Sequence, residues 1–301
     1  MTHPGVAVIS AFLAESGVTT GSVADQRAAM AAAAASAPPP EGVTVRSLSL
    51  SLAGRPAETL TPEGVTSDAM VLYLHGGGYC SGSLDSHRGL GARLAVASGC
   101  PVTVLDYRLA PEHPYPAAVD DAVAAYDELM ARGARPEQLA IAGDSAGGGL
   151  TVATLLALRA AGHPLPAAAV CLSPWVDLTQ SAPSYERLAD FDPMVSKAGL
   201  DLMAEAYLGG EDPRHGLASP LFADDLSGLP PVRVEVGEYE VLLDDATRLV
   251  ERLGSAGVTA SLTVWPELIH VFQAFPGSLV PEADESVAGI GAFLAENLRH
   301  P

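Results

Sequence analysis

Short apolar runs separated by longer stretches with helical spacing dominate the chain after residue 69. Most of these runs do not alternate with polar residues, which is typical of parallel strands covered on both faces. The alternation of strand-like and helical stretches predicts an α/β fold with a doubly wound, mostly parallel sheet. The predicted strands are Met70–Leu74, Val102–Leu105, Leu139–Ala142, Ala167–Leu172, Val232–Val236 and Ala260–Trp265.

Helical periodicity is expected between these strands and at the start of the chain. Residues 1–37 are predicted to be helical, because apolar residues recur at helical spacing from Val6 and an alanine-rich run follows. Three prolines at 38–40 end that segment, and residues 43–52 then alternate as in a half-buried strand. The later predicted helices are Ala117–Arg132, Ala146–Ala161 and Asp245–Ala256.

One segment departs from this rhythm. Between Leu178 and about Asp225 no strand-like run occurs, but apolar residues recur at helical spacing over 197–208. An insertion at the carboxyl edge of such a sheet would lie over the crevice where ligands bind. We interpret this insertion as one half of a helical cap, with the N-terminal segment as the other half. The alternative is that the insertion is a surface loop without a role in binding. The expected division is a cap segment over 1–42, a catalytic domain over 43–178 and 223–301, and a cap insertion over 179–222.

Composition narrows the classes of partner. The chain of 301 residues is 48% hydrophobic, enough for a sizeable core, and its 16 basic and 36 acidic residues give a net charge of −20. Such a surface repels phosphate backbones and anionic lipid, so we expect no nucleic-acid partner and no membrane insertion. Three scattered cysteines do not suggest a disulfide framework or a zinc site. Because we find neither a signal-peptide pattern nor an apolar run of membrane-spanning length, we expect a cytoplasmic location.

The sharpest chemical signal is the sequence Gly-Asp-Ser-Ala-Gly at 143–147, between a predicted strand and a predicted helix. This is the nucleophile-elbow pattern, in which a serine occupies a sharp turn and flanking glycines allow strand and helix to approach closely. The hydroxyl of Ser145 would project at a helix N-terminus, where developing negative charge is favoured. A glycine-rich structural turn is the alternative interpretation.

A second glycine-rich segment strengthens the first. His75-Gly76-Gly77-Gly78 follows the strand 70–74 and precedes Ser145 by about 70 residues. Glycines there allow backbone N–H groups to point at a bound oxyanion, and the N–H of Ala146 would supply a further donor. A flexible turn and a phosphate-binding loop are the alternatives. Phosphate binding is disfavoured, because no Gly-Lys-Ser/Thr sequence follows.

A serine nucleophile needs a base and an orienting acid, in the chain order serine, acid, histidine for this kind of site. Of the eight histidines, His270 lies in a loop just after the last predicted strand. The acid should follow the strand 232–236, where Glu238, Glu240, Asp244 and Asp245 are available. We choose Glu240, because it precedes the return of helical periodicity, and we keep Asp244 as the alternative.

These motifs resemble the hormone-sensitive-lipase-like α/β-hydrolases, also called bacterial esterase family IV. The resemblance extends from about residue 43 to the C-terminus and includes His75–Gly78, Gly143–Gly148, Asp106–Ala117, Ser173–Asp177, Asp192–Met194, Ser219–Leu221 and His270–Phe272. It implies the α/β-hydrolase fold, with a sheet of about eight strands under a helical cap. It also implies Ser145 as nucleophile, His270 as base, and Gly77, Gly78 and Ala146 as oxyanion donors. The acid in that family is often aspartate, whereas this chain has Glu240 at the matching position.

The resemblance implies hydrolysis of short- to medium-chain acyl esters, without cofactor or metal. A lactone hydrolase or a deacetylase of a small metabolite would use the same machinery, and a non-catalytic ligand receptor on this fold is the alternative from another class. We therefore expect a small-molecule ester as substrate, and a homodimer is compatible with the sequence. The prolines of 106–117 would make that segment rigid, with Arg108 or Glu112 available for ion pairs that brace nearby loops.

Overall fold

A single eight-stranded sheet forms the centre of the molecule. The computed structural model of the chain describes residues 3–16, 21–36 and 44–298. The strand order is β1-β2-β4-β3-β5-β6-β7-β8; β1 and β2 are antiparallel to their neighbours, and all other pairs are parallel. The strands are β1 Val45–Leu52, β2 Arg55–Pro62, β3 Met70–Leu74, β4 Val102–Leu105, β5 Leu139–Asp144, β6 Ala168–Leu172, β7 Val232–Gly237 and β8 Ala260–Trp265. This confirms the predicted fold class.

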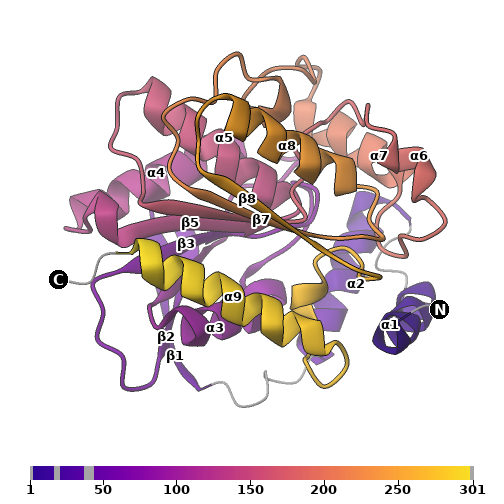
Figure 1. Cartoon of the computed structure of the whole chain (residues 1–301), viewed down its shortest axis with the longest axis horizontal. Helices are drawn as coiled ribbons and strands as arrows, with labels where there is room; N and C mark the ends of the chain where they lie inside the picture. Colours follow the sequence, from indigo (N-terminus) through magenta and orange to yellow (C-terminus); the bar gives the residue numbers. More distant parts are fainter. Residues whose placement is uncertain (1–2, 17–20, 37–43, 299–301) are drawn as a thin grey trace.

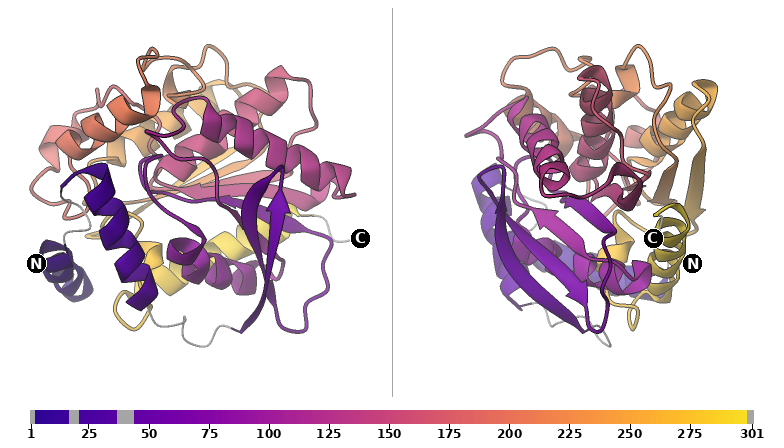
Figure 2. Two further views of the ribbon diagram at one scale, coloured as in Figure 1. Left: turned by 180° about the vertical axis from the view of Figure 1, so that it is seen from behind. Right: turned by 90° about the vertical axis from the view of Figure 1, so that its left-hand side faces the viewer.

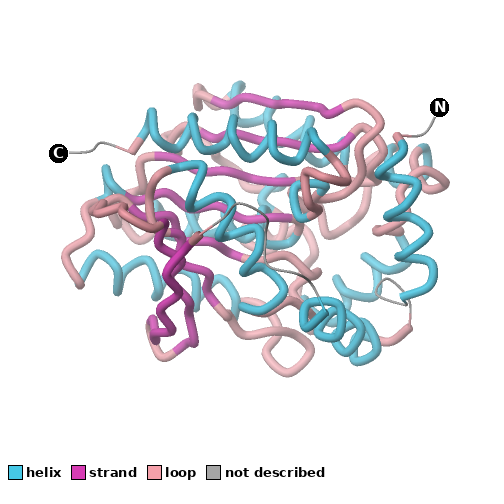
Figure 3. Tube along the Cα trace, turned by 90° about the horizontal axis from the view of Figure 1, so that it is seen from below, coloured by secondary structure: helices cyan, strands magenta, loops and turns pink. Residues whose placement is uncertain are grey.

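Helices cover both faces of the sheet, as the buried parallel strands require. α4, α5 and α8 cover one face and α3 and α9 the other (Figure 1), and α3 and α9 also cross the sheet side by side in the view from below (Figure 3). The helices are α1 Pro4–Ser16, α2 Val23–Ser36, α3 Leu84–Ser98, α4 Ala117–Ala131, α5 Ala146–Ala160, α6 Ser184–Arg187, α7 Lys197–Leu208, α8 Leu243–Ser255 and α9 Pro281–Asn297, with short 3₁₀ turns at Pro136–Gln138, Pro220–Phe222 and Phe272–Ala274.

The apolar runs located the six parallel strands to within two residues, but β2 was missed. Its sequence contains Glu58, two threonines and two prolines, so it lacks an apolar pattern. Glu58 is nevertheless buried, because Arg88 of α3 binds its carboxylate at 2.9 Å. A charge that is neutralised by a distant residue cannot be recognised from local periodicity.

The strand expected at 43–52 is present as β1, with residue 43 outside the described residues, but the expected half-burial is wrong for most of it. Its only buried residue is Leu52, and Leu48 is 66% exposed. The β1–β2 hairpin twists away from the helical layers (Figure 2), so the apolar side chains of β1 have little to pack against. β8, at the opposite edge, is also only partly covered. Edge strands lack a neighbour on one side, which alternation alone does not reveal.

The two segments expected to form a cap are helical and lie at the same end of the sheet. α1 and α2 lie at the same end of the molecule as α6 and α7, below them in Figure 1, and α7 coincides with the periodic stretch at 197–208. Within the expected segment 1–42, residues 1–2, 17–20 and 37–42 lie outside the described residues. Within the described ranges, no helix combines the length and apolarity needed to cross a membrane.

Candidate active site

Ser145 lies at a strained turn between β5 and α5. Its backbone angles are φ 54° and ψ −122°, a conformation that non-glycine residues rarely adopt and that is often found at functional sites. The flanking glycines explain how the turn closes. A Cβ on Gly147 would lie 1.9 Å from the carbonyl oxygen of Leu74, and one on Gly143 would lie 2.3 Å from the carbonyl oxygen of Gly147. Only glycine at these two positions allows α5 to begin against β3.

The backbone of Ser145 is fixed, whereas its hydroxyl is free. Its N–H donates to the carbonyl of Leu172 at 2.8 Å, and its carbonyl accepts from the N–H of Trp175 at 2.9 Å, so the end of β6 and the loop after it hold the turn on both sides. Ser145 is 8% exposed. In the described part of the chain, its hydroxyl has no hydrogen-bond partner, and no hydrogen bond joins it to His270.

The glycine-rich loop after β3 presents unused backbone donors. Gly77 and Gly78 have φ angles of 113° and 62°, which strongly favour glycine. Among the residues that the structure describes, no acceptor pairs with the N–H of Gly77, Gly78 or Ala146. Buried backbone N–H groups are almost always paired. Unpaired donors on this loop and at the first residue of α5 are therefore suited to an anionic ligand.

Asp144, the residue before the serine, attaches this loop to β5. Its Oδ1 accepts the N–H of Gly76 at 3.0 Å and the hydroxyl of Tyr73 at 2.8 Å, and its Oδ2 lies 3.3 Å from Nε2 of His87. Burial opposes ionisation of Asp144, but the neighbouring His87 and the hydrogen bonds from His87 and Tyr73 outweigh it, so its pKa is lowered. In contrast, burial and the nearby His87 lower the pKa of His75 to about 3, which keeps that ring neutral.

Glu240 and His270 form a buried pair. Nδ1 of His270 lies 2.9 Å from Oε2 of Glu240, and the two side chains are 7% and 0% exposed. The other carboxylate oxygen accepts the hydroxyl of Ser173 at 2.7 Å and the N–H of Gly237 at 2.5 Å. With three donors around it, the Glu240 carboxylate is held in one orientation, and it orients the imidazole in turn.

The charges around His270 favour its protonated form. Burial by itself lowers the pKa of His270, but the hydrogen bond and charge of Glu240, with smaller contributions from Asp192 and Asp144, raise it above its ordinary value. Asp192 was not among the expected site residues. Burial raises its pKa to about 6, and its Oδ2 accepts the N–H of Val241, next to Glu240.

The other acidic candidates face away from the imidazole. Asp244 accepts the N–H of Ser184 and pairs with Arg187, both at 2.9 Å. Asp245 accepts two backbone N–H groups and the hydroxyl of Tyr185. Glu238 is exposed and accepts the N–H of Glu267. The geometry therefore brings only Glu240 of these four into hydrogen-bond contact with His270.

The four loops that follow β5, β6, β7 and β8 carry Ser145, Ser173, Glu240 and His270 respectively. Because these strands are parallel neighbours in the sheet, their carboxyl ends lie along one edge. Besides the bonds that Glu240 makes with Ser173 and His270, further hydrogen bonds join these loops. The N–H of Trp175 donates to the Ser145 carbonyl, and the N–H of Val271 donates to the Ser173 hydroxyl at 3.1 Å. The topology thus gathers residues that are up to 125 positions apart (145 to 270).

Both helical segments contact this edge. Tyr207 of α7 stacks on Tyr79 with ring centroids 3.8 Å apart, and Met203 lies so close to Gly78 that a Cβ there would meet its sulfur at 2.0 Å. On the other side, α1 contributes three buried residues to a cluster with the residues that flank His270. That cluster contains Val6, Ile9, Leu13, Leu268, Ile269, Phe272, Val280 and Ala283.

The expected bracing by segment 106–117 is confirmed. Arg108 binds the carboxylate of Asp121 of α4 through several hydrogen bonds of 2.7–2.9 Å. Glu112 forms a bidentate ion pair with Arg27 of α2, with both hydrogen bonds at 2.8 Å. Arg27 also donates to the carbonyls of Cys80 and Ala110, which links α2 to the end of the glycine-rich loop.

Comparison with known proteins agrees with this architecture. The family model described as alpha/beta hydrolase fold matches residues 71–274, about two thirds of the chain. The chain belongs to the alpha/beta hydrolase family. Within this family it resembles a crystal structure of an esterase from the bacterial hormone-sensitive lipase family, with TM-score 0.94, 44% identity, and coverage of 99% of this chain and 100% of that one.

Two curated relatives of this alpha/beta hydrolase carry functional names. An "Acetyl-hydrolase" from Streptomyces hygroscopicus is 49% identical over 224 residues, 74% of each chain. An "Esterase" from Acinetobacter venetianus is 35% identical over 258 residues, 84% of this chain and 83% of the relative. The alpha/beta hydrolase described here is a carboxylic ester hydrolase. In its described residues, no group of three or more His, Cys, Asp or Glu side chains is arranged to hold a metal ion.

Proposed function

We propose that this hydrolase is a serine carboxylesterase that cleaves short- to medium-chain acyl esters through an acyl-enzyme. Ser145 is the nucleophile, His270 the general base and Glu240 the orienting acid. The observation that carries the proposal is the buried hydrogen bond between Glu240 and His270 at 2.9 Å, at the sheet edge where Ser145 occupies its strained turn. Pairs of this kind activate a neighbouring hydroxyl by accepting its proton.

The reaction proceeds in two displacements. Oγ of Ser145 attacks the ester carbonyl while Nε2 of His270 takes the hydroxyl proton, and the N–H groups of Gly77, Gly78 and Ala146 stabilise the oxyanion. His270 then protonates the departing alcohol, which leaves an acyl group on Ser145. Water, deprotonated by His270, attacks the acyl-enzyme and releases the acid. The fixed charge of Glu240 stabilises the imidazolium in both halves of the cycle.

The helical segments complete the proposal. Residues 1–42 and 179–222 form the cap, and residues 43–178 with 223–301 form the catalytic domain. The contacts of Met203 and Tyr207 with the glycine-rich loop support the insertion as part of the substrate enclosure. The packing of α1 on the residues that flank His270 supports the N-terminal half. The cytoplasmic location and the homodimer stay predictions.

The test is hydrolysis of p-nitrophenyl acetate together with labelling by a fluorophosphonate probe. Ser145→Ala should lose turnover and labelling, and His270→Ala should lose several orders of magnitude in kcat. Ser98→Ala is the matched control, because Ser98 is a buried serine at the far end of α3 that bonds the carbonyl of Leu94. Full turnover in Ser145→Ala contradicts the proposal. Absence of labelling and turnover in the wild-type protein favours the receptor alternative.

The named relative from Streptomyces hygroscopicus favours one narrower candidate, removal of acetyl groups from a small molecule. A series of p-nitrophenyl esters from acetate to octanoate separates the two. Comparable kcat/KM values from acetate to octanoate support the broader esterase, and a more than tenfold preference for acetate over butyrate supports a deacetylase. Lactones in the same panel test the remaining alternative.

A further inference from the structure

Ser173 joins the acid of the site to the loop of the histidine. It follows β6 directly and is fully buried. Its hydroxyl donates to Oε1 of Glu240 at 2.7 Å and accepts the N–H of Val271 at 3.1 Å. A serine hydroxyl has one proton and two lone pairs, so it can serve a carboxylate and an amide at the same time.

Strained backbone occurs on both sides of this bridge. Ser173 has a φ of 45° and Val271 a φ of 46°. This left-handed region is uncommon for non-glycine residues, and a β-branched residue such as Val271 is an outlier there. Strain of this kind persists only where the surroundings hold the backbone firmly, and it concentrates at functional sites. The hydroxyl of Ser173 is one such restraint, because it bonds the strained Val271 directly.

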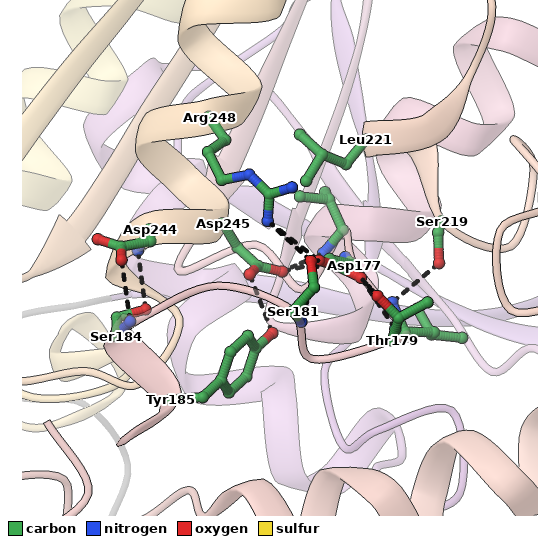
Figure 4. A network of polar contacts seen from close by, with 12 residues as sticks. Asp177, Thr179, Ser181, Ser184, Tyr185, Ser219, Leu221, Asp244, Asp245 and Arg248 are labelled. Atoms are coloured by element: carbon green, nitrogen blue, oxygen red, sulfur yellow. Dashed lines mark hydrogen bonds and ion pairs between the residues drawn. The ribbon is translucent and has the colours of Figure 1, made fainter. Parts of the chain in front are cut away.

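The rest of the Ser173 loop is fixed by buried polar groups. The backbone N–H of Trp175 donates to the carbonyl of Ser145, and the N–H groups of Val176 and Asp177 both donate to Oδ2 of Asp245 at 3.0 Å. Figure 4 shows how Tyr185 binds the other oxygen of Asp245 and how Arg248 pairs with Asp177. The loop is therefore immobilised from α6 and α8, and Ser173 is held at a defined position relative to Ser145.

We propose that Ser173 is a positioning residue for ester hydrolysis. Its hydroxyl fixes the position of the Glu240 carboxylate relative to the backbone after His270, so that Nε2 of the imidazole faces the nucleophile. The inference rests on the proposed roles of Ser145, Glu240 and His270. Alanine at this position would remove one donor from a buried carboxylate and leave the N–H of Val271 without a partner.

The first test compares Ser173→Ala with the buried control Ser98→Ala. Ser173→Ala should lower kcat for p-nitrophenyl acetate by about 10–100-fold, less than the roughly 10²–10⁴-fold that a positioned base contributes as a whole, and change KM by less than about threefold. Ser98→Ala should leave both constants unchanged. An unchanged kcat in a folded Ser173→Ala protein would overturn the inference. If the alanine variant does not fold, Ser173→Cys, whose side chain is slightly larger and keeps only a weak donor and acceptor, goes through the same assays; it should also lower kcat, and an unchanged kcat would overturn the inference.

The second test asks whether Ser173 acts through Glu240. In a Glu240→Ala background, Ser173→Ala should lower kcat by less than about threefold, because the group that it positions is gone. The same 10–100-fold loss in both backgrounds would indicate a merely structural role. The low-field proton resonance of His270 Nδ1–H, identified by its absence in His270→Ala, should shift or broaden in Ser173→Ala and not in Ser98→Ala. An unchanged resonance would count against the proposal.

Different results would contradict the proposed function and the role of Ser173. If Ser145→Ala still hydrolyses esters, the proposed function is wrong whatever Ser173 does. If Ser145→Ala is inactive while Ser173→Ala keeps wild-type kcat, the esterase proposal stands and only the role of Ser173 is wrong.

Discussion

Replacing Glu240 with glutamine should inactivate the enzyme while leaving its shape unchanged. One carboxylate oxygen, Oε1, receives the N–H of Gly237 and the hydroxyl of Ser173, and the other, Oε2, faces Nδ1 of His270. The oxygen of a glutamine must stay where two donors meet, so its NH₂ group must occupy the position that faces His270. Nδ1 then has to accept a hydrogen bond, which places the ring proton on Nε2.

That tautomer cannot take the proton of Ser145. In serine hydrolases the corresponding acid-to-amide exchange lowers kcat by about 10⁴-fold through the wrong tautomer, and we expect roughly 10³–10⁴-fold here. The pKa of His270 should also fall, because burial, the largest influence, lowers it, and the two main raising influences both come from Glu240. The residual activity of Glu240→Gln should therefore persist to lower pH than that of the wild type.

The assay is kcat for p-nitrophenyl acetate from pH 5 to 9, with circular dichroism to check folding. Glu238→Gln is the matched control: it makes the same chemical change two residues away on an exposed side chain and should stay within about twofold of wild type. Asp244→Asn tests the alternative acid and should retain most activity, because Asp244 faces Ser184 and Arg187. More than a tenth of wild-type kcat in Glu240→Gln, or a comparable loss in Asp244→Asn, would refute the assignment.

Three further predictions follow from the contacts of the site. Gly147→Ala should abolish the native fold or greatly lower Tm, because its Cβ would lie 1.9 Å from the Leu74 carbonyl. Gly254→Ala in α8, where a Cβ meets nothing within 4 Å, should instead stabilise the protein by about 0.5–1 kcal/mol in thermal melts; equal Tm values for the two variants would contradict this prediction. As the pH is lowered, kcat/KM should fall with an apparent pKa above 6.5, because the pKa of His270 is raised and only its neutral form accepts a proton. An apparent pKa below 6.5 in the pH–rate profile would contradict the environment described for His270. Arg27→Ala should lower the free energy of unfolding in urea by about 1–3 kcal/mol, because Arg27 binds two backbone carbonyls as well as Glu112. Glu112→Ala removes only the exposed partner of this ion pair and should cost at most about 1 kcal/mol; a larger loss for Glu112→Ala than for Arg27→Ala would contradict this bracing.

Local patterns located the strands and turns on which the candidate site residues lie. The six parallel strands were found to within two residues, because a strand covered on both faces needs a continuous apolar run. The turn at Ser145 was recognised because close approach of strand and helix requires glycine at fixed positions, which is a property of a few consecutive residues. The choice of Glu240 over Asp244 came from its place before the helical periodicity, and the hydrogen bond to His270 agrees with it.

Features that depend on non-local partners were not predicted. β2 was missed because its buried Glu58 is neutralised by Arg88, thirty residues later. The exposure of β1 follows from the twist of the hairpin. Asp192 and Ser173 appeared in the sequence only as points of family resemblance, and nothing local to them indicates contact with the Glu240 loop or the His270 loop.

Short windows of the chain were enough to predict the fold class, the sharp turn at Ser145, the glycine-rich loop and the sequence order of Ser145, Glu240 and His270, because hydrophobic period and turn chemistry are local properties. The adjacency of β5, β6, β7 and β8, which places Ser145, Ser173, Glu240 and His270 along one edge, is visible only in the folded molecule. The hydrogen bonds among those loops depend on strand order and helix packing. Both arise from burial summed over the whole chain, which no short window contains.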